Sequence, residues 1–148
     1  MIRILDNNAL DALYKSARRL RQEHCCYVPP EIVEEFTDAD REESWLRSQP
    51  LVNPRIDEAD FLARYAIHIN RYNGVSFYNQ KGFGDVAILA TLDILVGRLP
   101  STRALSQELF PEDRIFLVSD DGKLRKATAK NFGTDVTVET VEEFLSRC

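Results

Sequence analysis

The chain has 148 residues, of which 44% are hydrophobic and 29% charged, and its formal net charge at pH 7 is −5. This length and balance are typical of one globular domain with a sizeable core, so we expect a single domain over residues 1–148. No apolar run reaches the roughly 18 residues of a membrane span, and the first residues do not resemble a signal peptide, which predicts a cytoplasmic protein. The acidic balance disfavours nucleic-acid binding unless basic patches or bound cations offset it.

The first residues predict a strand followed by a helix. Ile2 to Leu5 is a short apolar run, and Asp6 follows it directly, at the carboxyl end of the expected strand. Asn7 or Asn8 is expected to cap a helix over residues 9–24, whose apolar residues recur at helical spacing beside a basic flank.

A second strand is predicted over CCYVPP, including both Cys25 and Cys26. Three cysteines with this spacing form neither a disulfide framework nor a metal site. The prolines stop the strand and favour the first turn of a helix that carries Glu34 and Glu35. These two side chains point about 100° apart on a helix, so they cannot both face one site directly, and the sequence leaves the choice open.

Three helices are predicted in the middle of the chain. Residues 37–49 suggest a polar surface helix, and residues 57–74 form a clear amphipathic pattern that ends at Gly74. His68 on that helix is expected to be a hydrogen-bonded or exposed side chain rather than a metal ligand. Asp85 is expected to cap or begin the most apolar helix, on which Asp93 is expected to face outward.

The stretch RIFLVSDDGKL predicts the central strand and the turn that follows it. Ile115 to Val118 is a continuous apolar run of the kind found in a strand buried on both faces. Ser119, Asp120 and Asp121 come next, and a helix is then expected to end at Gly133. Residues 134–148 predict a last strand and a closing helix.

Strands alternate with helices throughout, which predicts an α/β fold: three layers, α/β/α, around a central, mainly parallel sheet of four to five strands. The carboxyl ends of parallel strands meet at one edge of the sheet, where ligands bind in such folds. We therefore expect acids from four segments to converge there, namely Asp6, one of Glu34 and Glu35, Asp85, and one or both of Asp120 and Asp121.

Clustered carboxylates repel one another unless a cation lies among them. Oxygen ligands without His or Cys suit Mg²⁺ or Mn²⁺, so one or two such ions are the predicted cofactor. Such ions activate water and stabilise charge on a phosphate. Candidates for contact with a phosphate backbone are Lys123, Arg125 and Lys126 beside the acids, and Arg18 on the basic flank of the first helix.

Four short motifs together resemble the PIN-domain nuclease family, which includes VapC-like toxin ribonucleases. LDNN resembles the first motif and VPPEIVEEF the second, while FGDVAILAT and LVSDDGKL resemble the third and fourth. The resemblance extends over nearly the whole chain. It implies a PIN-like fold in which the catalytic, metal-binding acids are Asp6, Glu35, Asp85 and Asp121, with Asp120 as an assisting neighbour and with Asn7, Ser119 and Glu34 in supporting positions.

The resemblance also implies an activity and partners. The implied reaction is metal-dependent hydrolysis of phosphodiester bonds by an endoribonuclease, most often in single-stranded RNA, by a water that attacks in line. The implied partners are the RNA substrate, an antitoxin protein of a toxin–antitoxin pair, and a second copy of the chain, with pairing expected through helices within residues 10–20 and 61–72. No membrane partner is expected.

Two other functions are alternatives for the same residues, and the sequence favours the first of them over the second. A catalytically inactive PIN-like module that scaffolds a complex would carry the same acids. A phosphatase with an aspartate nucleophile needs a second Asp two residues later, where this chain has Asn8.

Overall fold

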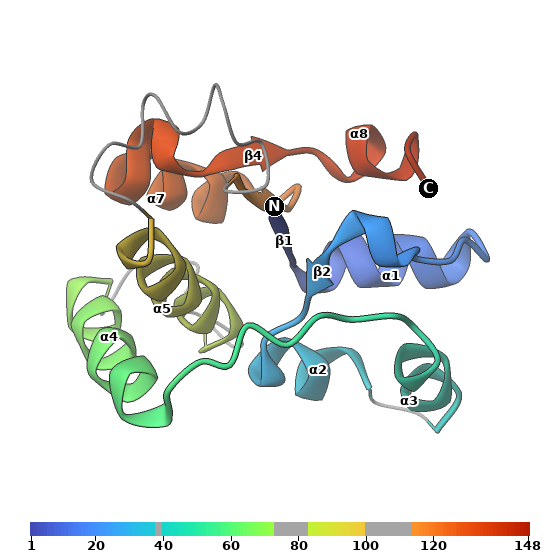
Figure 1. Ribbon diagram of the computed structural model, residues 1–148, viewed down its shortest axis with the longest axis horizontal. Helices are drawn as coiled ribbons and strands as arrows, with labels where there is room; N and C mark the ends of the chain where they lie inside the picture. Colours follow the sequence, from blue (N-terminus) through green and yellow to red (C-terminus); the bar gives the residue numbers. More distant parts are fainter. Residues whose placement is uncertain (38–39, 73–82, 100–113) are drawn as a thin grey trace.

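The computed structural model describes residues 1–37, 40–72, 83–99 and 114–148, and it has an α/β architecture (Figure 1). A parallel four-stranded sheet lies at the centre, with the strand order β2-β1-β3-β4. This confirms the predicted α/β class and the parallel sheet. The strands are β1 (Ile2–Leu5), β2 (Cys26–Tyr27), β3 (Ile115–Val118) and β4 (Thr137–Glu139).

Helices cover both faces of the sheet. Figure 1 shows α1 and α8 on one side and α5 and α7 on the other, with α4 packed against the outside of α5. The described helices are α1 (Asn7–Lys15), α2 (Pro30–Phe36), α3 (Asp40–Arg47), α4 (Glu58–Arg71), α5 (Phe83–Gly97), α7 (Gly122–Phe132) and α8 (Val141–Leu145), with short 3-10 turns η1 (Gln22–His24) and η4 (Gly133–Asp135).

The two central strands are the apolar runs that the sequence indicates. Every residue of β3 is buried, and β1 pairs with it in register from Ile2 opposite Ile115 to Leu5 opposite Val118. A strand covered on both faces needs this continuous apolar sequence. The core of the domain is therefore built around β1 and β3. Asp6 directly follows β1 and Ser119 directly follows β3, so both residues lie next to this core.

The first helix is shorter than predicted. It ends at Lys15, with Ser16 as its C-cap, and Ala17 has a left-handed backbone with φ of 54°. Beyond it, the Leu20 amide donates to the Gln49 side chain instead of a helical carbonyl. A tertiary contact thus replaces the helical hydrogen bonds that the pattern over residues 9–24 predicted.

Two further local predictions are corrected. Cys25 follows η1 with φ of 50°, so only Cys26 of the pair lies in β2. Asp6, not Asn7 or Asn8, is the N-cap of α1, because its carboxylate accepts the Asn7 amide. By contrast, Gly133 ends α7 as predicted, with φ of 55°.

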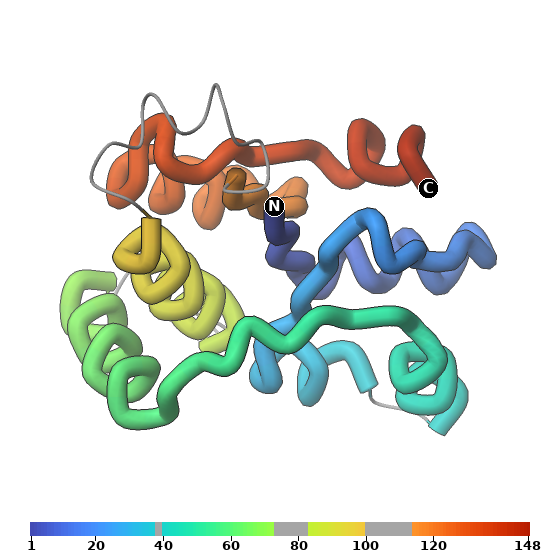
Figure 2. The backbone as a smooth tube through the Cα atoms, in the orientation of Figure 1, coloured from blue at the N-terminus to red at the C-terminus, as the bar shows by residue number. Residues whose placement is uncertain are grey.

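A long connection joins α3 to α4. Figure 2 shows residues 48–57 crossing the molecule in an extended path, and the Val52 amide donates to the Cys26 carbonyl at the edge of the sheet. Gly74, the predicted end of the helix over residues 57–74, lies outside the described residues. Within the described ranges, none of the helices combines the length and apolar character that crossing a bilayer requires.

The α4–α5 contact contains a polar pair that the sequence patterns do not predict. The His68 side chain is 1% exposed, and its Nε2 lies 2.6 Å from Asp93 Oδ2. The Asp93 carboxylate therefore points toward α4, although 26% of the side chain is exposed, and this corrects the prediction that Asp93 simply faces outward. His68 is hydrogen-bonded, as its position on an amphipathic helix suggested.

Candidate functional site

Two of the predicted acids begin helices at the same edge of the sheet. Asp6 follows β1, and its amide donates to the Val118 carbonyl of the neighbouring β3. Asp121 caps α7, where its Oδ1 accepts the amides of Lys123 at 2.9 Å and Leu124 at 3.1 Å. Each carboxylate is thus held at the positive end of a helix, which orients it and favours its charge.

Ser119 connects these two acids. Its hydroxyl, fully buried at the end of β3, donates to Asp6 Oδ2 at 2.7 Å. The same hydroxyl accepts the Asp121 amide at 3.1 Å. One serine therefore fixes the Asp6 carboxylate and the turn that carries Asp121.

Asp85 brings a third carboxylate to this edge from the first turn of α5. The pKa of Asp85 is raised to about 8, chiefly by burial and then by the negative charges of Asp6, Asp121 and Glu35, in that order. Burial also raises the pKa of Asp6, against the hydrogen bonds from Ser119 and Asn7, which lower it. The carboxylates of Asp6, Glu35, Asp85 and Asp121, called the acidic site below, therefore interact electrostatically across four elements.

The position of Gly84 explains how α2 approaches α5. A Cβ atom at Gly84 would lie 2.5 Å from Glu35 Oε1 and 2.8 Å from Ile32 Cδ1, closer than real Cβ contacts. The absence of a side chain at Gly84 thus lets Glu35 reach the start of α5 beside Asp85. Glu34, one residue earlier, is exposed on another face of α2. Of the two glutamates that the sequence left open, the structure places Glu35 in the acidic site.

Asp120 points elsewhere. Its Oδ1 accepts the Val141 amide at 2.9 Å, so the carboxylate binds the start of α8. It is exposed and is not among the charges that act on Asp85. Asn7 has a buried Oδ1 without a hydrogen-bond partner among the described residues.

The predicted basic residues fall into two groups. Lys123 and Lys126 are exposed and Arg125 is half-buried, all on the first turns of α7, directly after Asp121. Arg18 lies beyond the other end of α1, where its guanidinium donates to the Leu145 carbonyl near the end of α8. Arg18 therefore lies at the opposite end of α1 from Asp6, and its contact with a phosphate backbone stays a prediction.

The acidic site contains only oxygen donors, and this donor set fits Mg²⁺ or Mn²⁺ rather than zinc or copper. Both bonds to Asp121 fall on Oδ1, which leaves its Oδ2 without a donor in the described part of the chain. As the side chains are placed, no three Asp, Glu, His or Cys residues within the described ranges stand close enough to hold a metal ion.

Comparison with known proteins adds no relative: no family model, no curated protein and no solved structure matches this chain.

Proposed function

We propose that this chain is a metal-dependent nuclease with a PIN-like fold that hydrolyses phosphodiester bonds in single-stranded RNA. The observation that carries the proposal is the approach of four carboxylates from β1, α2, α5 and the end of β3. Of the four residues, Asp6 is buried and the others are half-buried. Mutual repulsion among such carboxylates is costly, so such a group is retained where a cation offsets it.

The residues have separate roles in this proposal. Asp6, Glu35, Asp85 and Asp121 would hold the ion, and Ser119 would keep Asp6 in position through its hydrogen bond. The chemistry supplied by Mg²⁺ or Mn²⁺ at such a site is activation of water and stabilisation of charge on the phosphate. Lys123 and Lys126 would hold the flanking backbone of the RNA, since both are exposed beside Asp121.

The alternative function is a catalytically inactive binding module. The observation in its favour is that Asp6 and Asp121 already serve as helix caps, while no three described acids are close enough for a metal. For either function, the proposed protein partners are an antitoxin protein and a second copy of the chain. The exposed Leu62 and Ile67 on α4 support a protein contact there.

A paired substitution on α2 tests the nuclease. Cleavage of single-stranded RNA should require Mg²⁺ or Mn²⁺ and stop in excess chelator. Glu35→Gln should lower the rate by about 100-fold, because it removes a charged ligand. Glu34→Gln, the same change on the exposed face of the same helix, should leave the rate unchanged. Cleavage that continues in chelator would refute the mechanism, and its complete absence in the wild-type protein would favour the binding module.

A further inference from the structure

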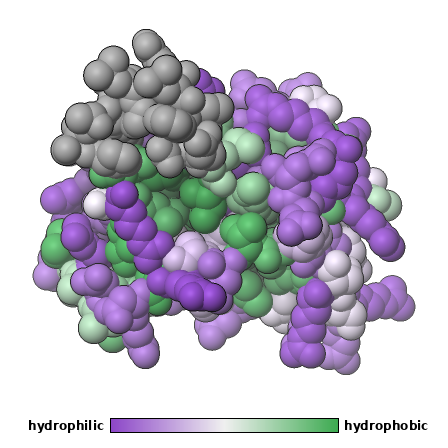
Figure 3. Space-filling model, in the orientation of Figure 1, coloured by the Kyte–Doolittle hydropathy of each residue, from purple (hydrophilic) through white to green (hydrophobic). Residues whose placement is uncertain are grey.

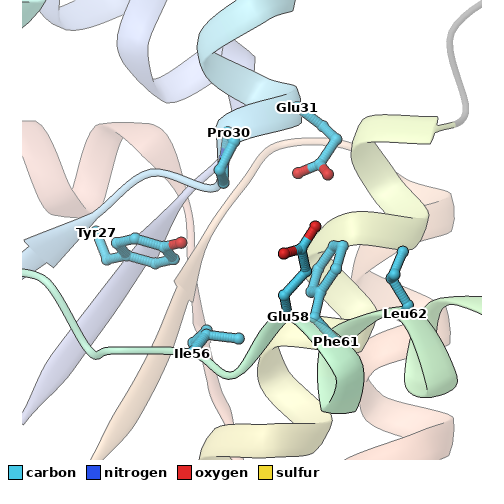
Figure 4. A pocket seen from close by; sticks show the side chains of 7 residues that line it. All are labelled: Tyr27, Pro30, Glu31, Ile56, Glu58, Phe61 and Leu62. Carbon is cyan, nitrogen blue, oxygen red and sulfur yellow. The ribbon is translucent and has the colours of Figure 1, made fainter.

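A cavity of about 350 Å³ lies between β2, α2 and the start of α4, and none of the four residues of the acidic site lines it (Figure 4). Sites for small ligands begin near this size. The lining residues that matter here are Tyr27, Glu31, Ile56, Glu58, Phe61 and Leu62.

One part of the wall is apolar and aromatic. Figure 4 shows the Tyr27 ring on one side of the cavity and the Phe61 ring on the other, with Ile56 between them. The Phe61 ring also packs against the Tyr65 ring, and the two ring centroids lie 5.8 Å apart. Leu62 is 56% exposed at the rim, and apolar side chains appear at the surface over α4 and α5 in Figure 3. Flat or aliphatic parts of a ligand would be in contact with this wall.

The other part of the wall is negatively charged. Figure 4 shows the carboxylates of Glu31, from α2, and Glu58, from α4, facing each other across the cavity. Oε2 of Glu31 is buried and has no hydrogen-bond partner among the described residues. A buried acceptor without a donor is unfavourable, and two facing carboxylates also repel each other.

The Tyr27 phenol lies close enough to Glu31 for the charge of that carboxylate to affect it. Burial raises the pKa of the Tyr27 phenol, and the negative charge of Glu31 raises it further. Both glutamates lie in the first turn of a helix, where the dipole favours acids. The dipole accounts for their presence in the sequence, but it supplies no donor to the buried oxygen of Glu31.

We propose that this cavity binds a guanidinium group carried on an apolar stem. A guanidinium is planar, always charged and has five N–H donors in a fixed fork, so it can donate hydrogen bonds to two carboxylates at once. Its flat faces stack on aromatic rings, here those of Tyr27 and Phe61. A neutral nucleobase would leave both negative charges uncompensated. The guanidinium can belong to a free small molecule or to an arginine side chain of a polypeptide.

This proposal does not depend on the nuclease function. Glu31 lies one helical turn before Glu35 on α2, so the cavity and the acidic site are neighbours built from different residues. Loss of RNA cleavage would therefore say nothing about the cavity, and binding at the cavity can be measured without RNA.

The test is a titration of the full chain with N-acetylarginine amide, followed by NMR or calorimetry. The matched control is N-acetylcitrulline amide, which has the same shape and no charge. Saturable binding of the arginine compound, with at least about tenfold weaker binding of the citrulline compound, is expected for a charge-assisted site. Equal binding of the two compounds, or no saturation with either, would overturn the proposal.

Three variants locate the binding. Glu58→Gln and Glu31→Gln should each weaken binding of the arginine compound by about tenfold, because each removes one of the two charges. Glu34→Gln removes the same charge from the exposed face of α2 and should leave binding unchanged. An equal loss of affinity in Glu34→Gln would mean that the general negative charge of the protein attracts the arginine compound, and it would overturn the proposed site. Glu58 is exposed, so its variant keeps the test valid if Glu31→Gln fails to fold.

Two further probes identify the source of the guanidinium. Tighter binding of a blocked Ala-Arg-Ala peptide than of the single amino acid supports a polypeptide arginine, and equal binding supports a free guanidine compound. Guanosine tests the competing ligand class. Displacement of the arginine compound by guanosine at similar concentration would overturn the choice of a cation.

Discussion

The Ser119 hydroxyl donates a 2.7 Å hydrogen bond to Asp6 Oδ2 across 113 residues of sequence. Both groups are buried, and this bond lowers the pKa of Asp6 against the effect of burial. Ser119 therefore helps to keep an ionised carboxylate at the carboxyl edge of the sheet.

Ser119→Ala tests this role. The variant leaves one Asp6 oxygen without its donor, so the free energy of unfolding should fall by about 1–3 kcal/mol. The pKa of Asp6 should rise, and metal-dependent cleavage should weaken. Ser16→Ala is the control, because it removes a hydroxyl that donates only to the Leu13 carbonyl at the end of α1. Chemical denaturation and cleavage assays measure both effects, and a Ser119→Ala protein that matches the wild type in both would contradict the role.

Gly84→Ala should affect activity more than stability. The added methyl group would meet the flexible ends of Glu35 and Ile32, and these can move away. The strain of about 1–3 kcal/mol is partly offset by the gain of about 1 kcal/mol from replacing glycine in a helix. The displaced Glu35 carboxylate should then lower the cleavage rate.

Gly97→Ala is the matched control for Gly84→Ala. It lies at the end of the same helix, with no atom within 4 Å of the added Cβ. It should retain full activity and gain up to about 1 kcal/mol of stability. If Gly84→Ala cleaves RNA at the wild-type rate, the position of Glu35 does not matter for the reaction.

The His68–Asp93 pair should stabilise the contact between α4 and α5. His68→Ala removes a fully buried ring and its hydrogen bond, so we expect a loss of about 2–4 kcal/mol. Asn70→Ala, on the exposed face of α4, should change stability by less than about 0.5 kcal/mol. A double-mutant cycle with Asp93→Ala measures the coupling, expected at about 1 kcal/mol or more. Strict additivity of the two substitutions would show that the contact contributes no pairwise energy.

The stability of the metal-free protein should depend on pH through Asp85. Its pKa is about 8 in the folded chain, against an ordinary value of 3.8 for an aspartate, so the folded state binds a proton that the unfolded state has lost between these values. Stability should therefore fall as pH rises from about 4 to about 8, by at most about 1.4 kcal/mol per pH unit for this one proton. Above about pH 8 both states are ionised and this contribution becomes constant.

Asp85→Asn tests whether Asp85 is the group that binds this proton in the folded state. The variant should be less sensitive to pH than the wild type over the same window, and Asp60→Asn, on the exposed face of α4, should keep the wild-type dependence. Denaturation curves at several pH values in chelator give the comparison. An unchanged slope in Asp85→Asn would mean that Asp85 does not take up the proton on folding.

The strands and most helices could be predicted because their signals are local. The apolar run of β3 and the glycine after α7 each determine an element boundary within a few residues. The end of α1 could not be predicted, because a contact between Leu20 and Gln49 competes with the helix. The pairing of His68 with Asp93 could not be predicted either. The two residues are 25 positions apart, and the sequence is equally consistent with each side chain being exposed to solvent.

The acidic site could be predicted as a set of strand-end acids, but the chemistry of the residues left each pair open, and only the family resemblance implied Glu35 and Asp121. Glu35 is distinguished from Glu34 by the approach of α2 to Gly84, which is a tertiary contact. Asp120 is distinguished from Asp121 by its bond to the Val141 amide at the start of α8. Both choices depend on elements that lie far away in the sequence.

The last prediction separates stability from chemistry at Asp6. Asp6→Asn removes a buried charge that lies near other carboxylates, so the metal-free variant should melt at the same temperature as the wild type or higher. The asparagine keeps an oxygen that can accept the Asn7 amide and an NH₂ group that can donate to Ser119, so the local structure should survive. Cleavage of single-stranded RNA should nevertheless fall by about 100-fold or more, because a neutral ligand binds the cation more weakly.

Asp120→Asn is the control for that comparison. It also replaces an acid at the carboxyl edge of the sheet, but its side chain binds the start of α8 and can still accept the Val141 amide. Its melting temperature and cleavage rate should both stay close to those of the wild type. A paired measurement of melting in chelator and of cleavage in Mg²⁺ decides the question, because a merely structural role for Asp6 would lower both quantities together. Wild-type cleavage by Asp6→Asn would exclude Asp6 from the reaction, and lost cleavage in Asp120→Asn would show that the selection of Asp121 over Asp120 is wrong.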